Sequence, residues 1–176
     1  GWGLANKLEH RLHETEFYKI TEQGGLIITE NTSPANRTIV VSSGNVYTGV
    51  TSQIVNAFNS STDTFTLASL SGTTWTYTNQ TVYDNSNYNI SDGLVAMTNN
   101  YYGVRWYYRS IGDIKQTFYV LGNQYNKLID AENSQPRTDI PNVLKYHCML
   151  IGKSIIQQGS ATGTTSSTLG VVLTAL

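Results

Sequence analysis

The side chains best suited to molecular recognition are five aromatic rings and two arginines in "NNYYGVRWYYRS", residues 99–110. In a β-strand, alternate side chains point to opposite faces. One face would then carry an apolar set suited to a core, consisting of Tyr102, Val104, Trp106 and Tyr108. The other face would carry an aromatic and cationic set, consisting of Tyr101, Arg105, Tyr107 and Arg109. Because Tyr and Arg often anchor interfaces, the second face is a candidate contact for a ligand or a neighbouring subunit.

Two further aromatic side chains, Trp75 and Tyr77, lie in "TTWTYTNQTVY" and are added to these candidates. Rings of this kind, together with Tyr101 and Tyr107, could stack on sugar rings. The alternative is a sheet surface held together by cross-strand pairs or covered by a neighbouring subunit. The sequence leaves both interpretations open.

Residues that could catalyse hydrolysis or hold a metal form no convincing pattern. His10 and His13 are three residues apart on an expected helix, but no third ligand lies nearby. The aspartates mostly fall in turn or cap positions, where Asp is common for structural reasons. No phosphate-binding glycine loop, nucleophile elbow or zinc-protease motif is present. We therefore predict a protein that is not an enzyme and that uses no metal or other cofactor.

The single cysteine, Cys148, excludes an intrachain disulfide. It lies in the apolar run "YHCMLIG", where a free cysteine behaves as a small buried hydrophobe. We expect it to be buried and inert. Five N-x-S/T sequences begin at Asn31, Asn36, Asn59, Asn79 and Asn89. In a chain this rich in Asn, Ser and Thr they carry little information about glycosylation.

Charge and hydropathy exclude two classes of partner. Charged residues make up only 13% of the chain, and the 11 Lys and Arg are scattered, whereas nucleic-acid binding needs clustered cations. No run of about 18 apolar residues occurs, so we predict no membrane insertion. The surface is expected to be neutral and rich in hydroxyl and amide groups.

The periodicity of apolar residues changes near residue 15. Leu4, Leu8 and Leu12 recur every four residues, which predicts an amphipathic helical connector over residues 1–14. From there to residue 158, short runs of β-branched and aromatic residues alternate with polar turns. This pattern predicts a mainly β, antiparallel β-sandwich-like domain.

Within that domain we expect one or two short helices near residues 124–147. Residues 159–176 are rich in Gly, Ser and Thr and end on apolar residues. They predict an extended tail or connector. We expect either that the chain is part of something longer or that a partner covers the tail.

The order of five segments resembles a domain that recurs in bacteriophage tail-fibre and other virion structural proteins. The resemblance covers roughly residues 37–162, and the order and spacing of the segments carry it. The segments are "TIVVSSGNVYTGVTS", "TDTFTLASLSGTTWTYTNQTVYDNSNYN", "GLVAMTNNYYGVRWYYRSIGD", "FYVLGNQYNKLIDAENSQPRTDIP" and "CMLIGKSIIQQGSAT".

The resemblance implies a structural module of a phage tail fibre or baseplate, extracellular on the virion, that contributes to host attachment. It implies a homotrimer that contacts other virion tail proteins and a host-surface glycan or protein, and it brings no catalytic residues. A carbohydrate-binding module is the alternative. A polysaccharide depolymerase is a third possibility, which the short chain and the lack of visible repeats disfavour.

Overall fold

The computed structural model describes residues 17–18, 25–30, 37–48, 51–110 and 116–159. The predicted connector helix over residues 1–14, with His10 and His13, lies outside the described residues. The predicted tail also lies outside them, apart from Gly159. The domain boundaries drawn from the sequence therefore stay predictions.

Strands dominate the described part of the chain, as the sequence predicted. In chain order they are β1 (Phe17–Tyr18), β2 (Ile28–Glu30), β3 (Ile39–Val41), β4 (Gly44–Thr48), β5 (Thr51–Val55), β6 (Phe58–Asn59), β7 (Phe65–Ser71), β8 (Thr74–Gln80), β9 (Asn87–Tyr88), β10 (Val95–Ala96), β11 (Tyr102–Ser110), β12 (Thr117–Tyr125) and β13 (Cys148–Gln157). Two short helices, α2 (Leu128–Asn133) and α3 (Asn142–His147), fall in the region where helices were expected.

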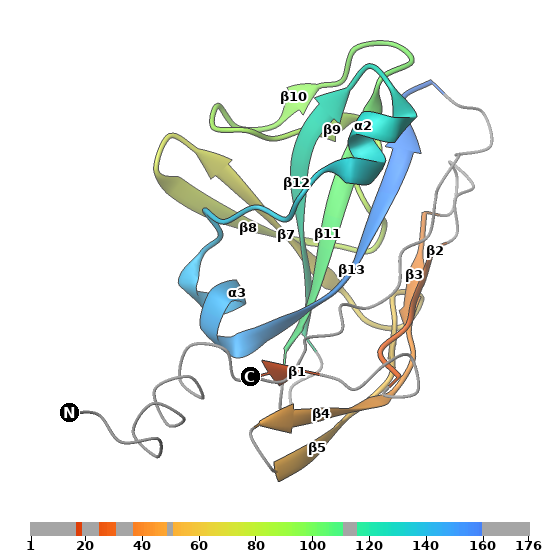
Figure 1. The fold of residues 1–176 in the computed structure, drawn as a ribbon, viewed down its shortest axis with the longest axis vertical. Coiled ribbons are helices and arrows are strands. Elements are labelled where there is room, and N and C mark those ends of the chain that lie inside the picture. The colour runs from red at the N-terminus through yellow and green to blue at the C-terminus, as the bar shows by residue number, and fades with distance from the viewer. Residues whose placement is uncertain (1–16, 19–24, 31–36, 49–50, 111–115, 160–176) are drawn as a thin grey trace.

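The central element is a five-stranded sheet with the order β13-β11-β12-β7-β8 (Figure 1). Strand β11 is the aromatic strand of the sequence, and it pairs antiparallel with β12 and with β13. One pairing differs from the predicted antiparallel arrangement: β12 runs parallel to β7. After the β7–β8 hairpin the chain passes through β9 and β10 and joins the sheet at β11. It then turns back into β12, which therefore runs in the same direction as β7.

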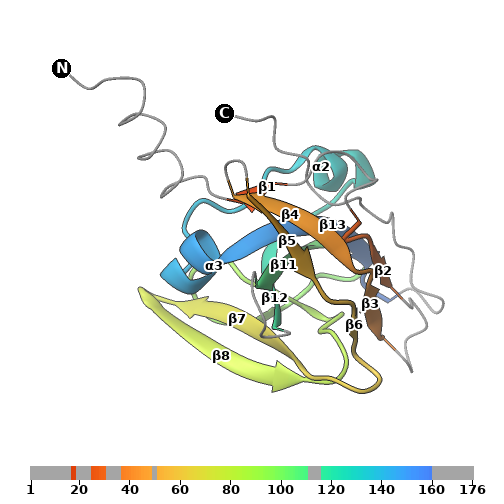
Figure 2. The same cartoon turned by 90° about the horizontal axis from the view of Figure 1, so that it is seen from below.

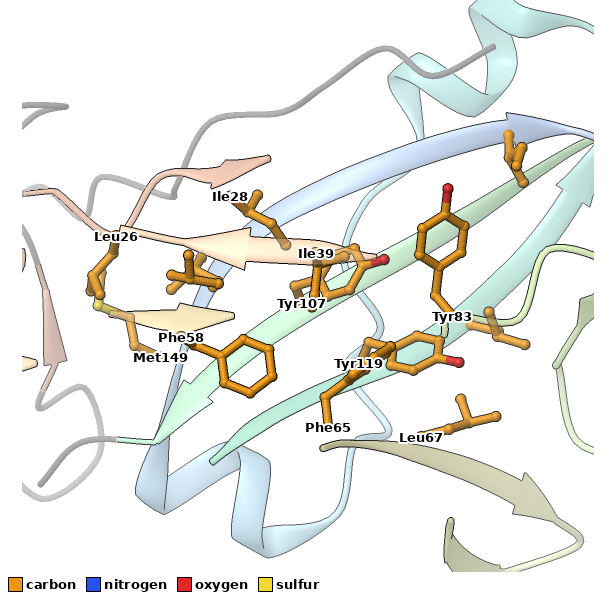
Figure 3. Packing of buried hydrophobic residues seen from close by; sticks show 14 of the residues in the cluster. Leu26, Ile28, Ile39, Phe58, Phe65, Leu67, Tyr83, Tyr107, Tyr119 and Met149 are labelled. Atoms are coloured by element: carbon orange, nitrogen blue, oxygen red, sulfur yellow. The ribbon is translucent and has the colours of Figure 1, made fainter. Parts of the chain in front are cut away.

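One face of this sheet is covered by a small sheet with the order β2-β3-β6 (Figure 2). The buried side chains between the two layers form one hydrophobic cluster (Figure 3). It includes Leu26, Ile28, Ile39, Val41, Val55, Phe58, Phe65, Leu67, Tyr83, Met97, Tyr107, Tyr119, Leu121, Met149, Ile151 and Ile156. The two facing layers give the sandwich-like arrangement that the strand pattern predicted.

The opposite face of the five-stranded sheet is covered by α2, α3 and the segment that joins them (Figure 2). Each helix contributes one buried anchor, Ala131 from α2 and Leu144 from α3. The sheet contributes the predicted apolar positions Val104, Trp106 and Tyr108. Helices of only six residues cover a sheet face incompletely, and the binding cleft described below lies on this face.

Candidate binding cleft

Three of the candidate contact residues are buried inside the protein. Arg105, Tyr107 and Arg109 are 1%, 0% and 1% exposed, because β2, β3 and β6 and the segments that carry Asn56 and Tyr83 cover their side of β11. The expected open aromatic and cationic face is therefore corrected: it is an interior face. Arg105 Nε donates to Tyr107 Oη (3.3 Å), and the Arg105 guanidinium lies 4.3 Å from the ring centre of Tyr83.

Arg109 is held by backbone oxygens. Its Nη1 donates to Gln116 O (2.7 Å) and its Nη2 donates to Asn56 O (3.2 Å). Burial lowers the pKa of Arg109, but a guanidinium keeps its proton under ordinary conditions. The two arginines of the aromatic strand therefore join the sheet to the segments that cover it.

The tyrosines on this face also form interior contacts. The rings of Tyr107 and Tyr119 stack at 5.6 Å, and Phe65 lies 5.4 Å from Tyr119 (Figure 3). The hydroxyl of Tyr119 donates to Gln80 Oε1 and accepts from the backbone N–H of Asp84 (2.9 Å). Burial raises the pKa of Tyr119. These hydroxyl groups are thus satisfied within the protein.

The other three candidates lie outside this cluster: Tyr101 precedes β11, whereas Trp75 and Tyr77 are two residues apart on one face of β8. Tyr101 is half-buried in the segment before β11. Trp75 is half-buried on β8, with the Arg137 guanidinium 5.3 Å from its ring. Tyr77, also on β8, is 48% exposed. The six residues therefore do not form one site.

A cleft of about 310 Å³ opens on the helix-bearing face of the sheet. Its floor is formed by Val104 and Trp106 of β11 and by Gly122 of β12. One wall is residues 89–91, which follow β9, and another is the segment after α2. The complete lining is Asn89, Ile90, Ser91, Val104, Trp106, Gly122, Asn123, Tyr125, Ser134, Gln135, Arg137 and Asp139.

An irregularity in the β11–β12 pairing shapes the floor. The register shifts between Gly103 and Arg105, so that Gly122 and Asn123 interrupt the ladder. A Cβ atom placed on Gly122 would lie 3.4 Å from Trp106 Nε1 and 3.6 Å from Val104 Cβ. Because glycine has no side chain, the space beside the indole N–H stays open.

Arg137 holds the walls in place. Its Nη1 donates to Asn89 O (2.7 Å) and Leu121 O (2.9 Å), and its Nη2 donates to Ile90 O (2.7 Å). Nε and Nη2 donate to the two carboxylate oxygens of Asp139 at 3.0 and 2.8 Å. The hydrogen bond from Arg137 lowers the pKa of Asp139. All five N–H groups of the guanidinium are thus engaged with the protein.

Lys153 fixes the start of the wall that is formed by the segment after α2. Its Nζ donates to Glu132 O (2.7 Å) and Ser134 O (3.0 Å), at the end of α2. The same ammonium lies 4.9 Å from the ring centre of Trp106. Burial lowers the pKa of Lys153. The segment that forms this wall is therefore tied to the sheet by a cation at each end.

The side-chain amide of Asn89 hydrogen-bonds the backbone of β7 at Leu70, as the backbone of a neighbouring strand would. Its Oδ1 accepts from the backbone N–H of Leu70 (2.8 Å), and its Nδ2 donates to Leu70 O (2.9 Å) and Gly93 O (2.7 Å). Asn89 is 1% exposed. The N-x-S sequence at this position therefore has a structural role, and its amide is not accessible for glycosylation in the folded domain.

Trp106 provides the cleft with a hydrogen-bond donor, its indole N–H. Its side chain is 95% buried, since only 5% is exposed. Within the described part of the chain its indole N–H makes no hydrogen bond, and it borders the open space beside Gly122. Ser91, Asn123, Tyr125 and Gln135 add neutral donors and acceptors. This lining suits the binding of a ligand rich in hydroxyl groups.

Sequence reasoning assigned Trp106 to the core, which is correct, but missed that its polar edge borders a cleft. It also missed Gly122, Arg137 and Asp139. A glycine inside the run "FYVLGNQY" was the available signal for a break in the strand. The nearby opposite charges of Arg137 and Asp139 in "QPRTDIP" were the signal that this segment is fixed by an ion pair.

Cys148 is buried, as predicted, and is 6% exposed. Burial raises the pKa of its thiol to about 12. Among the described residues, no group of three or more His, Cys, Asp or Glu could hold a metal ion. None of the helices described has the length and apolar character needed to span a bilayer.

Comparison of the chain with known proteins returns no matching family model, no matching curated protein and no matching solved structure. The cleft is therefore interpreted from its own geometry.

Proposed function

We propose that this chain is a host-attachment module of a phage tail fibre or baseplate and that it binds a carbohydrate in the cleft. The observation that carries the binding role is the cleft itself, with its open space beside the indole N–H of Trp106 and its neutral polar lining. The tail-fibre assignment rests on the ordered segments of the sequence. As such a module, the protein would act on the outside of the virion as a trimer joined to other tail proteins.

The lining of the cleft favours binding over hydrolysis. Glycoside hydrolysis ordinarily uses two carboxyl groups placed on either side of the scissile bond. Among the described residues that line the cleft, Asp139 is the only carboxylate, and its two oxygens accept hydrogen bonds from Arg137. A depolymerase is therefore the weaker proposal for this site.

A bacterial-glycan array probed with the fluorescently labelled full chain tests the binding role. We expect signal on at least one class of surface saccharide and no release of reducing ends from it. Addition of the bound saccharide should then reduce adsorption of the chain to cells that display it. An array without any signal would contradict the carbohydrate-binding role.

The assembly part needs a separate measurement. Mass photometry of the purified chain should show a trimer. A monomer that keeps its folded far-ultraviolet and near-ultraviolet spectra would contradict the trimeric assembly and leave the binding role untouched.

A further inference from the structure

We infer that the cleft selects a neutral sugar unit over an acidic one and that the indole N–H of Trp106 donates a hydrogen bond to one oxygen of that sugar. This inference rests on the proposed carbohydrate-binding function and specifies its ligand. Three features of the cleft support it: the cation, the carboxylate and the indole donor.

The cation of the cleft is not available to an acidic ligand. Sugar carboxylates are commonly bound by arginine through two parallel hydrogen bonds. In this cleft every N–H group of Arg137 already donates to the backbone oxygens of Asn89, Ile90 and Leu121 or to Asp139. Binding a ligand carboxylate there would break contacts that hold the two walls together.

The carboxylate of the cleft further disfavours a negative ligand. The side chain of Asp139 is 56% exposed, whereas that of Arg137 is 10% exposed. The negative partner of this ion pair is thus the one that solvent and ligand meet. A uronic acid or sialic acid would bring its own charge towards a carboxylate, while a neutral hexose would offer hydroxyl groups that can donate to it.

The indole donor requires an oxygen on the ligand. The Trp106 ring is 5% exposed, so a sugar cannot stack across its face and meets only its N–H edge. Because this N–H borders the open space of the cleft, a ligand hydroxyl or carbonyl oxygen beside Gly122 can accept a hydrogen bond from it. The volume of about 310 Å³ lies at the small end of ligand sites, which are typically about 300–1,000 Å³, and suits a single sugar unit.

The test uses matched pairs of immobilised glycans, in which each neutral hexose is printed beside its uronic acid and each asialo chain beside its sialylated form. The probe is the full chain, and the affinity for every bound member is then measured by titration. We expect signal on neutral members, with the acidic partner of each pair at least about tenfold weaker.

Two variants address the indole donor. Trp106→Phe keeps an aromatic ring but removes the N–H, and we expect about tenfold weaker binding, which corresponds to one lost hydrogen bond. Gly122→Ala leaves the indole intact but places a methyl group 3.4 Å from its nitrogen, and we expect a similar or larger loss. Tyr146→Phe on α3 removes a hydroxyl from an exposed ring outside the cleft and is the control.

A third variant addresses selectivity. Asp139→Asn removes the exposed negative charge, so the neutral-to-acidic preference should fall several-fold while thermal stability changes little. A purely structural role for Asp139 would not move this ratio. The ratio is therefore the decisive readout.

The possible outcomes separate the inference from the function on which it rests. If no glycan binds, the proposed function fails. If glycans bind but acidic members match or exceed their neutral partners, the inference is overturned and the function survives. If Trp106→Phe and Gly122→Ala both bind as well as the unmodified chain, the sugar does not occupy this cleft, so the inference and the proposed location of binding are both overturned, while carbohydrate binding itself survives.

Discussion

The two faces of the five-stranded sheet are covered in different ways. The face that carries Arg105, Tyr107 and Arg109 lies beneath the β2-β3-β6 sheet, and all three side chains are at most 1% exposed. The face that carries Trp106 lies beneath two six-residue helices and their connecting segment, and it retains a cleft of about 310 Å³. A second sheet seals a flat face, whereas short helices leave part of it open.

The contrast shows that residue type alone does not mark a binding surface. The sealed face has the more typical binding residues, but their polar groups hydrogen-bond within the chain. The helix-bearing face has the more apolar strand positions, but there a glycine and a register shift leave an indole N–H open. The predictions below test this contrast, beginning with the largest expected effect.

The sealed face should contribute more to stability. Phe65 is 0% exposed and packs on Phe58 and Tyr119, whereas Phe118, on the helix-bearing face, is 7% exposed. We expect Phe65→Ala to lower the free energy of unfolding by about 3–5 kcal/mol, and Phe118→Ala to lower it by less. Urea denaturation of both variants measures the difference. An equal or larger loss for Phe118→Ala would break the comparison.

The walls of the cleft should depend on Arg137. In Arg137→Met the backbone oxygens of Asn89, Ile90 and Leu121 lose their shared donor, and we expect a loss of about 2–3 kcal/mol in unfolding free energy. Carbohydrate binding should be lost as well, because the two walls are no longer joined. Calorimetry and the glycan titration together check this. A variant that binds normally would show that the walls are held by other contacts.

Cys148 offers a chemical test of how well the helix-bearing face excludes solvent away from the cleft. We expect the native chain to resist a thiol-specific reagent at pH 8 and to react fully in denaturant. Because the folded pKa of about 12 lies above the ordinary value of 9.0, the stability contribution of the buried thiol is complete below pH 9 and declines as pH rises towards 12. Rapid labelling of the native chain would contradict the burial.

Asp139 should give a smaller pH effect of opposite sign. Arg137 depresses its folded pKa below the ordinary 3.8, so its contribution is present above pH 3.8 and is lost as pH falls through the folded pKa. Because Asp139 is more than half exposed, the effect is expected to be slight. Unfolding midpoints between about pH 2 and 5 should fall less steeply for Asp139→Asn than for the unmodified chain. Identical profiles would mean that the ion pair adds nothing to stability.

Tyr77 should give the smallest effect. It is 48% exposed on β8 and does not line the cleft, so Tyr77→Ala should change stability by less than about 0.5 kcal/mol and leave glycan binding unchanged. Glycan titration and denaturation are the measurements. Lost binding would place the ligand on the exposed strand.

The strands and their alternation could be predicted because a period of two is local information. It correctly assigned Val104, Trp106 and Tyr108 to a core, and separate helix signals placed short helices in the right region. It could not say that the opposite side of β11 is also buried. Such burial depends on segments earlier in the chain, namely Asn56, Tyr83 and the strands β2, β3 and β6, of which the strands lie more than forty residues before β11.

The cleft could not be predicted for a related reason. Gly122, Trp106 and Arg137 come from β12, β11 and the segment after α2, and only the register shift and the hydrogen bonds of Arg137 bring them together. A sequence shows none of these contacts. It showed only that a glycine interrupted a strand and that an arginine stood near an aspartate.

The parallel β7–β12 pairing also has a consequence for folding order. The β7–β8 and β11–β12 hairpins are each built from neighbouring segments, but they are joined by only three residue pairs, Phe118 with Thr66, Tyr119 with Leu67 and Val120 with Ala68. These pairs span 52 residues of chain. Because forming them requires closing a long loop, we expect them to form late in folding. The domain should thus assemble as two local units that dock along a narrow seam, and amide exchange should report that seam as the first part of the sheet to open.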